Sequence, residues 1–108
     1  MSAAVDDKDA RRLAAALKGL AHPVRLRVLA QAEKGVKLSA SKLQATMPEV
    51  ALGTVSYHVR CLAQAGLLDG AGGAPRRGAI ERFYVLSPAG LQMRALLGQM
   101  SAALDMAP

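Results

Sequence analysis

The sequence predicts a mainly α-helical domain that carries one small β-hairpin. The chain has 108 residues, of which 52% are hydrophobic but only 3% aromatic. A core built from Leu, Val, Ala and Met favours helices over a β-sandwich. Apolar residues recur at helical spacing in most of the chain, and one segment, Ile80 to Leu86, is typical of a strand instead. The length fits a single domain, residues 1–108, with a modest core.

The charge balance favours an anionic partner. Lys and Arg number 14 against 8 Asp and Glu, which gives a net charge of +6 at neutral pH. Such a balance suits nucleic acid or a membrane surface, although a basic soluble protein without either partner is the alternative. No apolar run approaches the ~20 residues that cross a bilayer, and the first residues lack the apolar core of a secretion signal. We therefore expect a cytoplasmic protein with no membrane partner.

The first helix is expected to begin at Asp7, after a frayed end at residues 1–6. Acidic residues lie in its first turn, and Gly19 is its expected stop. The chain then turns at a histidine–proline pair. His22 stands at an N-cap position, and Pro23 occupies the first helical residue, where its missing N–H is harmless.

The second helix should run to about Ala32 and lie centrally, because it is apolar on more than one side. Arg25 and Arg27 are expected at its exposed edges. After it, Val36 to Leu38 alternates in polarity and could form one short strand.

A helix-turn-helix is predicted over residues 39–66. Ser39 or Ser41 caps its first helix, which runs from Lys42 to about Met47. Residues 48–51 form the turn to the second helix.

The second helix of this pair, within Leu52 to Leu68, has two different faces. Val55, Val59 and Leu62 form an apolar stripe that must pack on the core, and Gly66 ends the helix in a left-handed conformation. The whole segment contains no acidic residue. The side chains off the stripe suit insertion into the major groove of DNA, with base-edge contacts from Thr54, Ser56, Tyr57 and Arg60.

A hairpin follows, in which Leu67 to Asp69 should pair with Ile80 to Leu86. The glycine-rich segment 69–78 between them indicates a mobile loop rather than a packed element. Its tip carries Arg76 and Arg77, which could follow phosphates or enter the minor groove.

The last helix begins at Ser87-Pro88, an N-cap followed by a proline at the first helical position. Its apolar stripe exceeds what a small domain needs, and the first helix carries a similar apolar face. Burial in a homodimer is the simplest explanation for both faces. Packing of the first helix on the last within one chain is the alternative.

This order of elements resembles the ArsR-type winged helix-turn-helix transcriptional regulators. Three segments carry the resemblance, LAHPVRLRVL (20–29), TVSYHVRCLAQAGLL (54–68) and RRGAIERFYVLSPAG (76–90). The resemblance implies a wing over residues 67–86 and a dimerisation helix over residues 88–105. It also implies a homodimeric repressor on a pseudo-palindromic operator, with recognition helices ~34 Å apart.

The resemblance further implies a role for individual residues. Base reading falls on Thr54, Ser56, Tyr57 and Arg60, wing contacts fall on Arg76, Arg77 and Arg82, and the dimer interface falls on Leu13, Leu17, Met93, Leu97 and Met100. Beyond the resemblance, we expect phosphate contacts from Ser41 and Lys42 and a dimer contact from Leu104, which continues the apolar stripe of the last helix.

The sequence departs from the metal-sensing members of this family. They carry a cysteine pair on the third helix, where this chain reads SASKLQATM, and the last segment, 88–108, holds only Asp105 and no histidine. His22 and His58 are the only histidines, and we expect them far apart, with His58 structural. A metal site needs several converging ligands, so we expect no metal and no cofactor.

Other classes of protein remain as alternatives. Paired carboxylates, a phosphate-binding glycine loop and a Ser-His-Asp arrangement are all missing, which argues against an enzyme. A winged-helix protein–protein adaptor and a non-specific architectural DNA binder stay open. The signal that releases DNA is equally open: a small-molecule effector between the dimer helices, oxidation of Cys61, another protein, or none.

Overall fold

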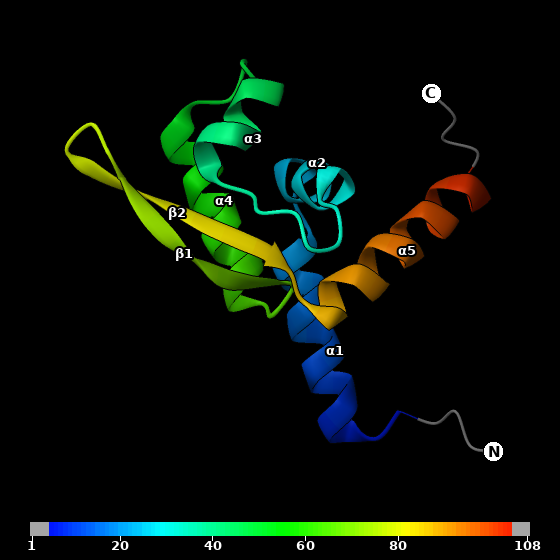
Figure 1. Ribbon diagram of the computed structural model, residues 1–108. Coiled ribbons are helices and arrows are strands. Elements are labelled where there is room, and N and C mark those ends of the chain that lie inside the picture. Colours follow the sequence, from blue (N-terminus) through cyan, green and yellow to red (C-terminus); the bar gives the residue numbers. More distant parts are fainter. Residues whose placement is uncertain (1–4, 105–108) are drawn as a thin grey trace.

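The computed structural model describes residues 5–104 (Figure 1). A β-hairpin projects from one side of a helical body, and the first and last helices leave that body in other directions (Figure 1). The order of elements is α1 (Asp7–Leu20), α2 (Pro23–Gln31), α3 (Ala40–Thr46), α4 (Leu52–Gln64), β1 (Leu68–Arg76), β2 (Ala79–Leu86) and α5 (Pro88–Ala103).

The predicted helix boundaries are largely confirmed, because local hydrogen bonds set them. The His22 ring caps α2 by accepting from the Val24 N–H at 3.1 Å, and the Ser87 hydroxyl caps α5 by accepting from the Gly90 N–H at 2.9 Å. Gly66 follows α4 with φ +81°, the left-handed conformation that glycine adopts at least cost.

The structure defines the starts of α3 and α1 more closely than the prediction. Ser39, and not Ser41, caps α3, since its hydroxyl accepts from the Lys42 N–H at 3.2 Å. Asp6 belongs to the start of α1 rather than to a frayed end, because its carboxylate accepts from the Asp9 N–H at 2.8 Å. Residues 1–4 of that predicted end, and the predicted last residue of α5, Asp105, lie outside the described residues.

The core forms between α2, α3, α4 and the base of the hairpin. The stripe Val55, Val59 and Leu62 is fully buried, as predicted. It packs with Val28 and Leu29 of α2 in one hydrophobic cluster. Removal of these apolar side chains from water holds α4 in place and leaves its opposite face in solvent.

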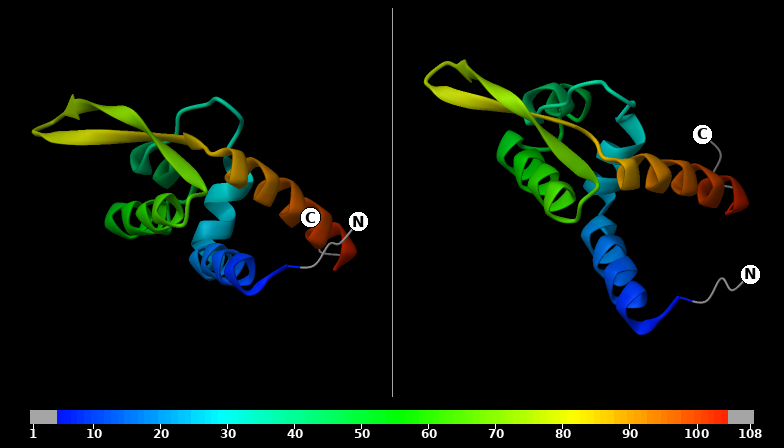
Figure 2. Two further views of the ribbon diagram at one scale, coloured as in Figure 1. Left: turned by 90° about the horizontal axis from the view of Figure 1, so that it is seen from below. Right: turned by 60° about the horizontal axis from the view of Figure 1, so that its bottom comes forward.

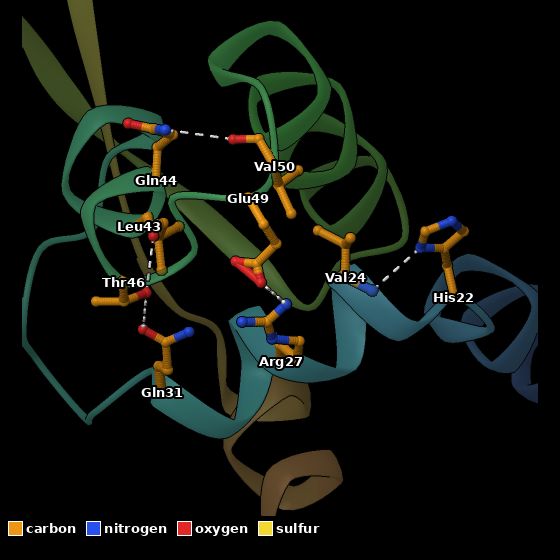
Figure 3. A network of polar contacts seen from close by, with 9 residues as sticks. All are labelled: His22, Val24, Arg27, Gln31, Leu43, Gln44, Thr46, Glu49 and Val50. Atoms are coloured by element: carbon orange, nitrogen blue, oxygen red, sulfur yellow. Dashed lines mark hydrogen bonds and ion pairs between the residues drawn. The ribbon is translucent and has the colours of Figure 1, made fainter.

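Polar contacts tie the turn of the helix-turn-helix to α2 (Figure 3). Arg27 pairs with Glu49 at 3.2 Å, and the Thr46 hydroxyl donates to the Gln31 side chain at 2.6 Å. Arg27 therefore lies at an exposed edge as predicted. Arg25 does not: it is half-buried and points toward α4, where its guanidinium bonds to the His58 ring.

The hairpin is longer than predicted, and the prediction of a mobile loop over residues 69–78 is wrong. Strand β1 continues to Arg76 and pairs antiparallel with β2 from Leu68↔Leu86 to Arg76↔Ala79, with an irregularity between Gly70 and Gly73. Backbone pairing needs no side chains, so glycines can form a strand when a partner strand is present. At Gly73 a Cβ atom would lie 3.0 Å from the Ile80 side chain and 3.1 Å from the Glu81 carbonyl oxygen, so a larger residue would fit only if the partner strand moved slightly.

The predicted short strand at Val36 to Leu38 reduces to a single bridge. The Leu38 N–H donates to the Tyr84 carbonyl at 2.7 Å, and the Tyr84 N–H donates to the Leu38 carbonyl at 2.8 Å. This bridge joins the segment before α3 to β2.

Helices α1 and α5 diverge, so the alternative in which they pack on each other within one chain is wrong (Figure 2). Helix α1 packs on α4, and α5 packs on α2 and β2. As a result Leu13, Leu17, Met100 and Leu104 are each at least half exposed. Over residues 5–104, no helix combines the length and apolar character needed to cross a membrane.

Candidate nucleic-acid interface

The solvent face of α4 carries the residues predicted to read bases. Thr54, Tyr57 and Arg60 are exposed, and Ser56 is half-buried beside them. The Arg60 guanidinium lies one turn beyond Ser56 and donates to its hydroxyl at 3.4 Å. The face therefore presents hydroxyl groups, a phenol and one guanidinium, without a carboxylate.

A hollow of about 470 Å³ lies between α3, α4 and the hairpin. It brings together six of the nine residues predicted to contact DNA, namely Ser41, Ser56, Arg60, Arg76, Arg77 and Arg82. Four guanidinium groups thus surround one concave surface. Such an arrangement attracts a polyanion and can hold its phosphates by charge-assisted hydrogen bonds.

Three predicted residues lie outside the lining of this hollow. Thr54 and Tyr57 are on the solvent side of α4, and the Tyr57 ring meets the His58 ring edge-on with centroids 5.2 Å apart. The Lys42 ammonium lies 5.4 Å above the centre of the Phe83 ring. Tyr57 remains 52% exposed, so its hydroxyl is free to meet an approaching duplex.

The tip of the hairpin is a tight turn at Arg77 and Gly78, both with positive φ, 49° and 80°. As predicted, Arg76 and Arg77 lie at this tip. Positive φ at two adjacent positions matches the right-handed twist of the paired strands. The turn therefore places both arginines at the extremity of the wing, far from the core.

The sequence reading missed one charged residue of this surface. Glu81 is a carboxylate inside this basic surface, where one oxygen accepts from the Ser39 hydroxyl at 2.5 Å and the other lies 3.4 Å from the Arg76 guanidinium. The Ser39 hydroxyl, and to a lesser degree Arg76 and Lys42, lower the pKa of Glu81. The alternation of β2, combined with the N-cap assignment of Ser39, was the available signal.

The two histidines are neighbours, and the prediction that they are far apart is wrong. Their rings stack with centroids 4.0 Å apart, because the turn between α1 and α2 folds back over α4. Arg25 completes the cluster by donating to His58 Nδ1 at 3.0 Å and to the Gly19 carbonyl at 2.9 Å. His58 is therefore a buried structural residue. Among the described residues, no group of three or more His, Cys, Asp or Glu side chains is placed to hold a metal ion.

The predicted dimer residues lie on two separate faces. A groove of about 780 Å³ between α2 and α5 is lined by Leu97, Met100 and Leu104, while Leu13 and Leu17 project from α1. Met93 is half-buried and packs on the core of its own chain, as Leu97 does in part.

The central part of the chain is similar to a known family of domains. Residues 20–71 match the helix-turn-helix domain family, a segment that contains α2, α3 and α4. A comparison with curated proteins gives no match.

Several solved structures have the same fold over almost the whole chain. The AntR antimony-specific transcriptional repressor is 21% identical with a TM-score of 0.69, covering 98% of this chain and 91% of that one. The homodimeric winged helix-turn-helix DNA-binding domain of Mb0332 from Mycobacterium bovis, a possible ArsR-family regulator, is 24% identical with a TM-score of 0.62, covering 94% and 91%. A GntR-superfamily winged-helix protein from Halomicrobium mukohataei is 22% identical with a TM-score of 0.65, covering 96% and 76%.

The hairpin, the order of the helices and the similar solved structures all indicate the same fold. This chain therefore has the winged helix-turn-helix fold, and residues 20–71 within it match the helix-turn-helix domain family.

Proposed function

We propose that this chain is a sequence-specific transcriptional regulator that binds double-stranded DNA as a homodimer. The observation that carries the proposal is the acid-free solvent face of α4 beside a wing whose tip is basic. A winged-helix adaptor that binds protein has no need of both features. The regulators with which the fold is shared include a transcriptional repressor and a homodimeric DNA-binding domain.

Affinity and specificity come from different residues in this proposal. Lys42, Arg76, Arg77 and Arg82 contact phosphates and supply most of the affinity, which depends on salt because counterions are released. Residues of α4 read base edges in the major groove and supply the discrimination. Arg60 suits a guanine, whose O6 and N7 accept both arms of a guanidinium.

A homodimer accounts for the two apolar faces that one chain leaves exposed. The groove between α2 and α5 and the leucine face of α1 would be covered together in a two-fold pair. Such a pair presents two α4 helices about one duplex turn apart, and so reads a pseudo-palindromic operator. A dimer on an operator that overlaps a promoter blocks access of the polymerase, which makes the regulator a repressor.

The test begins with selection of duplexes from a randomised pool by the purified protein. Anisotropy then compares the enriched duplex with a shuffled one at several salt concentrations. A preference for the enriched duplex that persists as salt rises supports the proposal. Equal binding that collapses with salt would indicate an architectural binder, and no binding even at low salt would favour the adaptor.

A further inference from the structure

Glu81 occupies an unfavourable place for an acidic residue in a DNA-binding surface. It lines the same hollow as Arg60, Arg76, Arg77 and Arg82, and its side chain is only 13% exposed. The Ser39 hydroxyl lowers the pKa of this carboxyl, so Glu81 is ionised at neutral pH. A buried negative charge here repels phosphates and therefore needs a structural reason.

The partner of Glu81 is a fixed point of the helix-turn-helix. Ser39 is completely buried, and its hydroxyl both donates to Glu81 Oε2 and accepts from the Lys42 N–H, so it cannot move without uncapping α3. A charged acceptor makes this bond stronger than a neutral pair. Glu81 thus joins the wing to the first helix of the pair by one strong bond.

This bond is the outermost tie between the wing and the helices. Nearer the core, β2 is held to the segment before α3 by the Leu38–Tyr84 bridge. Tyr84 and Glu81 lie three residues apart, which is about 10 Å along a strand. These two hydrogen-bonded ties, with the Lys42 ammonium above the Phe83 ring between them, fix the direction of the hairpin. Loss of the outer tie leaves the distal part of the hairpin free to swing. Beyond Glu81, in the described chain, the wing makes no hydrogen bond or ion pair to a helix.

We propose that Glu81 is a positioning residue that sets DNA specificity by fixing the wing against α3. It acts through Ser39 and through the direction of the hairpin, and does not itself touch a base. A wing held in one direction lets its arginines reach phosphates only when α4 is seated in one register. A free wing finds phosphates on any duplex. This inference rests on the proposed function of the chain as a DNA-binding regulator.

Two substitutions separate the tie from the charge. Glu81→Ala removes both, whereas Glu81→Gln removes the charge but keeps an amide oxygen that can accept from the Ser39 hydroxyl. Asp69→Asn is the matched control, because Asp69 is an exposed acid on β1 of the same hairpin and its loss changes charge alone. Each variant is titrated on the duplex enriched by the wild type and on its shuffled counterpart.

We expect all three variants to bind the shuffled duplex more tightly, since each loses one negative charge. Only Glu81→Ala should lower the ratio of the two affinities, by about tenfold, the discrimination of a single base pair. A ratio unchanged in Glu81→Ala, or lowered equally in Glu81→Gln, would overturn the proposal.

A second measurement needs no DNA. Amide hydrogen exchange at residues 72–80 should be faster in Glu81→Ala than in the wild type, and close to wild type in Glu81→Gln. Equal exchange in all proteins would refute the tie directly. A wild type that enriches no duplex would instead refute the proposed function, and the exchange result would still decide whether Glu81 fixes the wing.

Discussion

The imidazole rings of His22 and His58 stack with centroids 4.0 Å apart and 28° between their planes. His22 Nδ1 accepts from the Val24 N–H, and His58 Nδ1 accepts from the Arg25 guanidinium. A guanidinium can only donate, so this hydrogen bond needs a His58 Nδ1 that carries no proton. The contact of the α1–α2 turn with α4 therefore favours an uncharged His58.

We predict that the protein loses stability as the pH falls below about 6.5, the ordinary value for histidine. Burial, helped by His22 and Arg25, lowers the pKa of His58 in the folded chain. Because the unfolded chain takes up this proton more readily, the stabilisation is complete above the ordinary pKa and is lost as the pH falls through the lowered one. Urea denaturation of the wild type and of His58→Gln at several pH values between 8 and 5 measures how the free energy of unfolding depends on pH. A pH slope of the same size in both proteins would contradict the prediction.

Gly90→Ala should destabilise the fold by about 1–3 kcal/mol or more, as overpacking does in a tight core. A Cβ atom there would lie 2.0 Å from the Leu67 carbonyl oxygen, a backbone atom that cannot move without displacing the chain. Gly53→Ala is the control, because that helical glycine has nothing within 4 Å of an added Cβ. Denaturation midpoints of the two variants should move in opposite directions, and a Gly90→Ala protein as stable as wild type would show that α5 can shift away from Leu67.

Arg60→Ala should weaken binding to the enriched duplex by about 1–3 kcal/mol and relax the preference at one base pair. The reason is the loss of a planar pair of donors on the exposed face of α4. Lys8→Ala, at the far end of α1, removes the same charge as a control. Competition binding with single-base variants of the duplex locates the position. An equal loss on specific and shuffled DNA would mean that Arg60 contacts only phosphate.

The double substitution Arg76→Ala and Arg77→Ala should weaken every duplex to a similar extent. Both arginines lie at the tip of the wing, and phosphate contacts carry no sequence information. The slope of log affinity against log salt should become shallower by about two, one for each lost contact. Anisotropy titrations across salt concentrations report this slope, and an unchanged slope would place the tip away from the backbone.

Leu17→Glu should convert the dimer to a monomer and weaken operator binding. Leu17 is 52% exposed on α1 of the single chain. In a two-fold interface a carboxylate at this position would be buried without a partner. Ile80→Glu, which changes an even more exposed apolar residue of the wing, should leave the molar mass of the dimer in solution unchanged. Sedimentation equilibrium measures both, and a wild type that sediments as a monomer at micromolar concentration would remove the basis for a palindromic operator.

The boundaries of the helices could be predicted because each depends on a few neighbouring residues. The Ser87-Pro88 pair, the His22-Pro23 pair and Gly66 act through hydrogen bonds and backbone angles within one turn. The faces of α4 were equally readable, since a period of 3.6 separates buried from exposed positions in the sequence itself.

Relationships between distant segments were beyond the sequence. Strand β1 looks like a loop until β2 supplies its backbone partner, and Glu81 looks like an exposed acid until α3 places Ser39 against it. The stacking of His22 on His58 likewise depends on how the α1–α2 turn crosses α4. By itself the sequence determined most of the elements, their order and the face of α4 that lies in solvent, because these follow from local geometry. Only the tertiary structure decided the length and direction of the wing and the contact between the two histidines. These features depend on pairing and packing between segments that are distant in the sequence, and their distance in the sequence does not tell how close they lie in space.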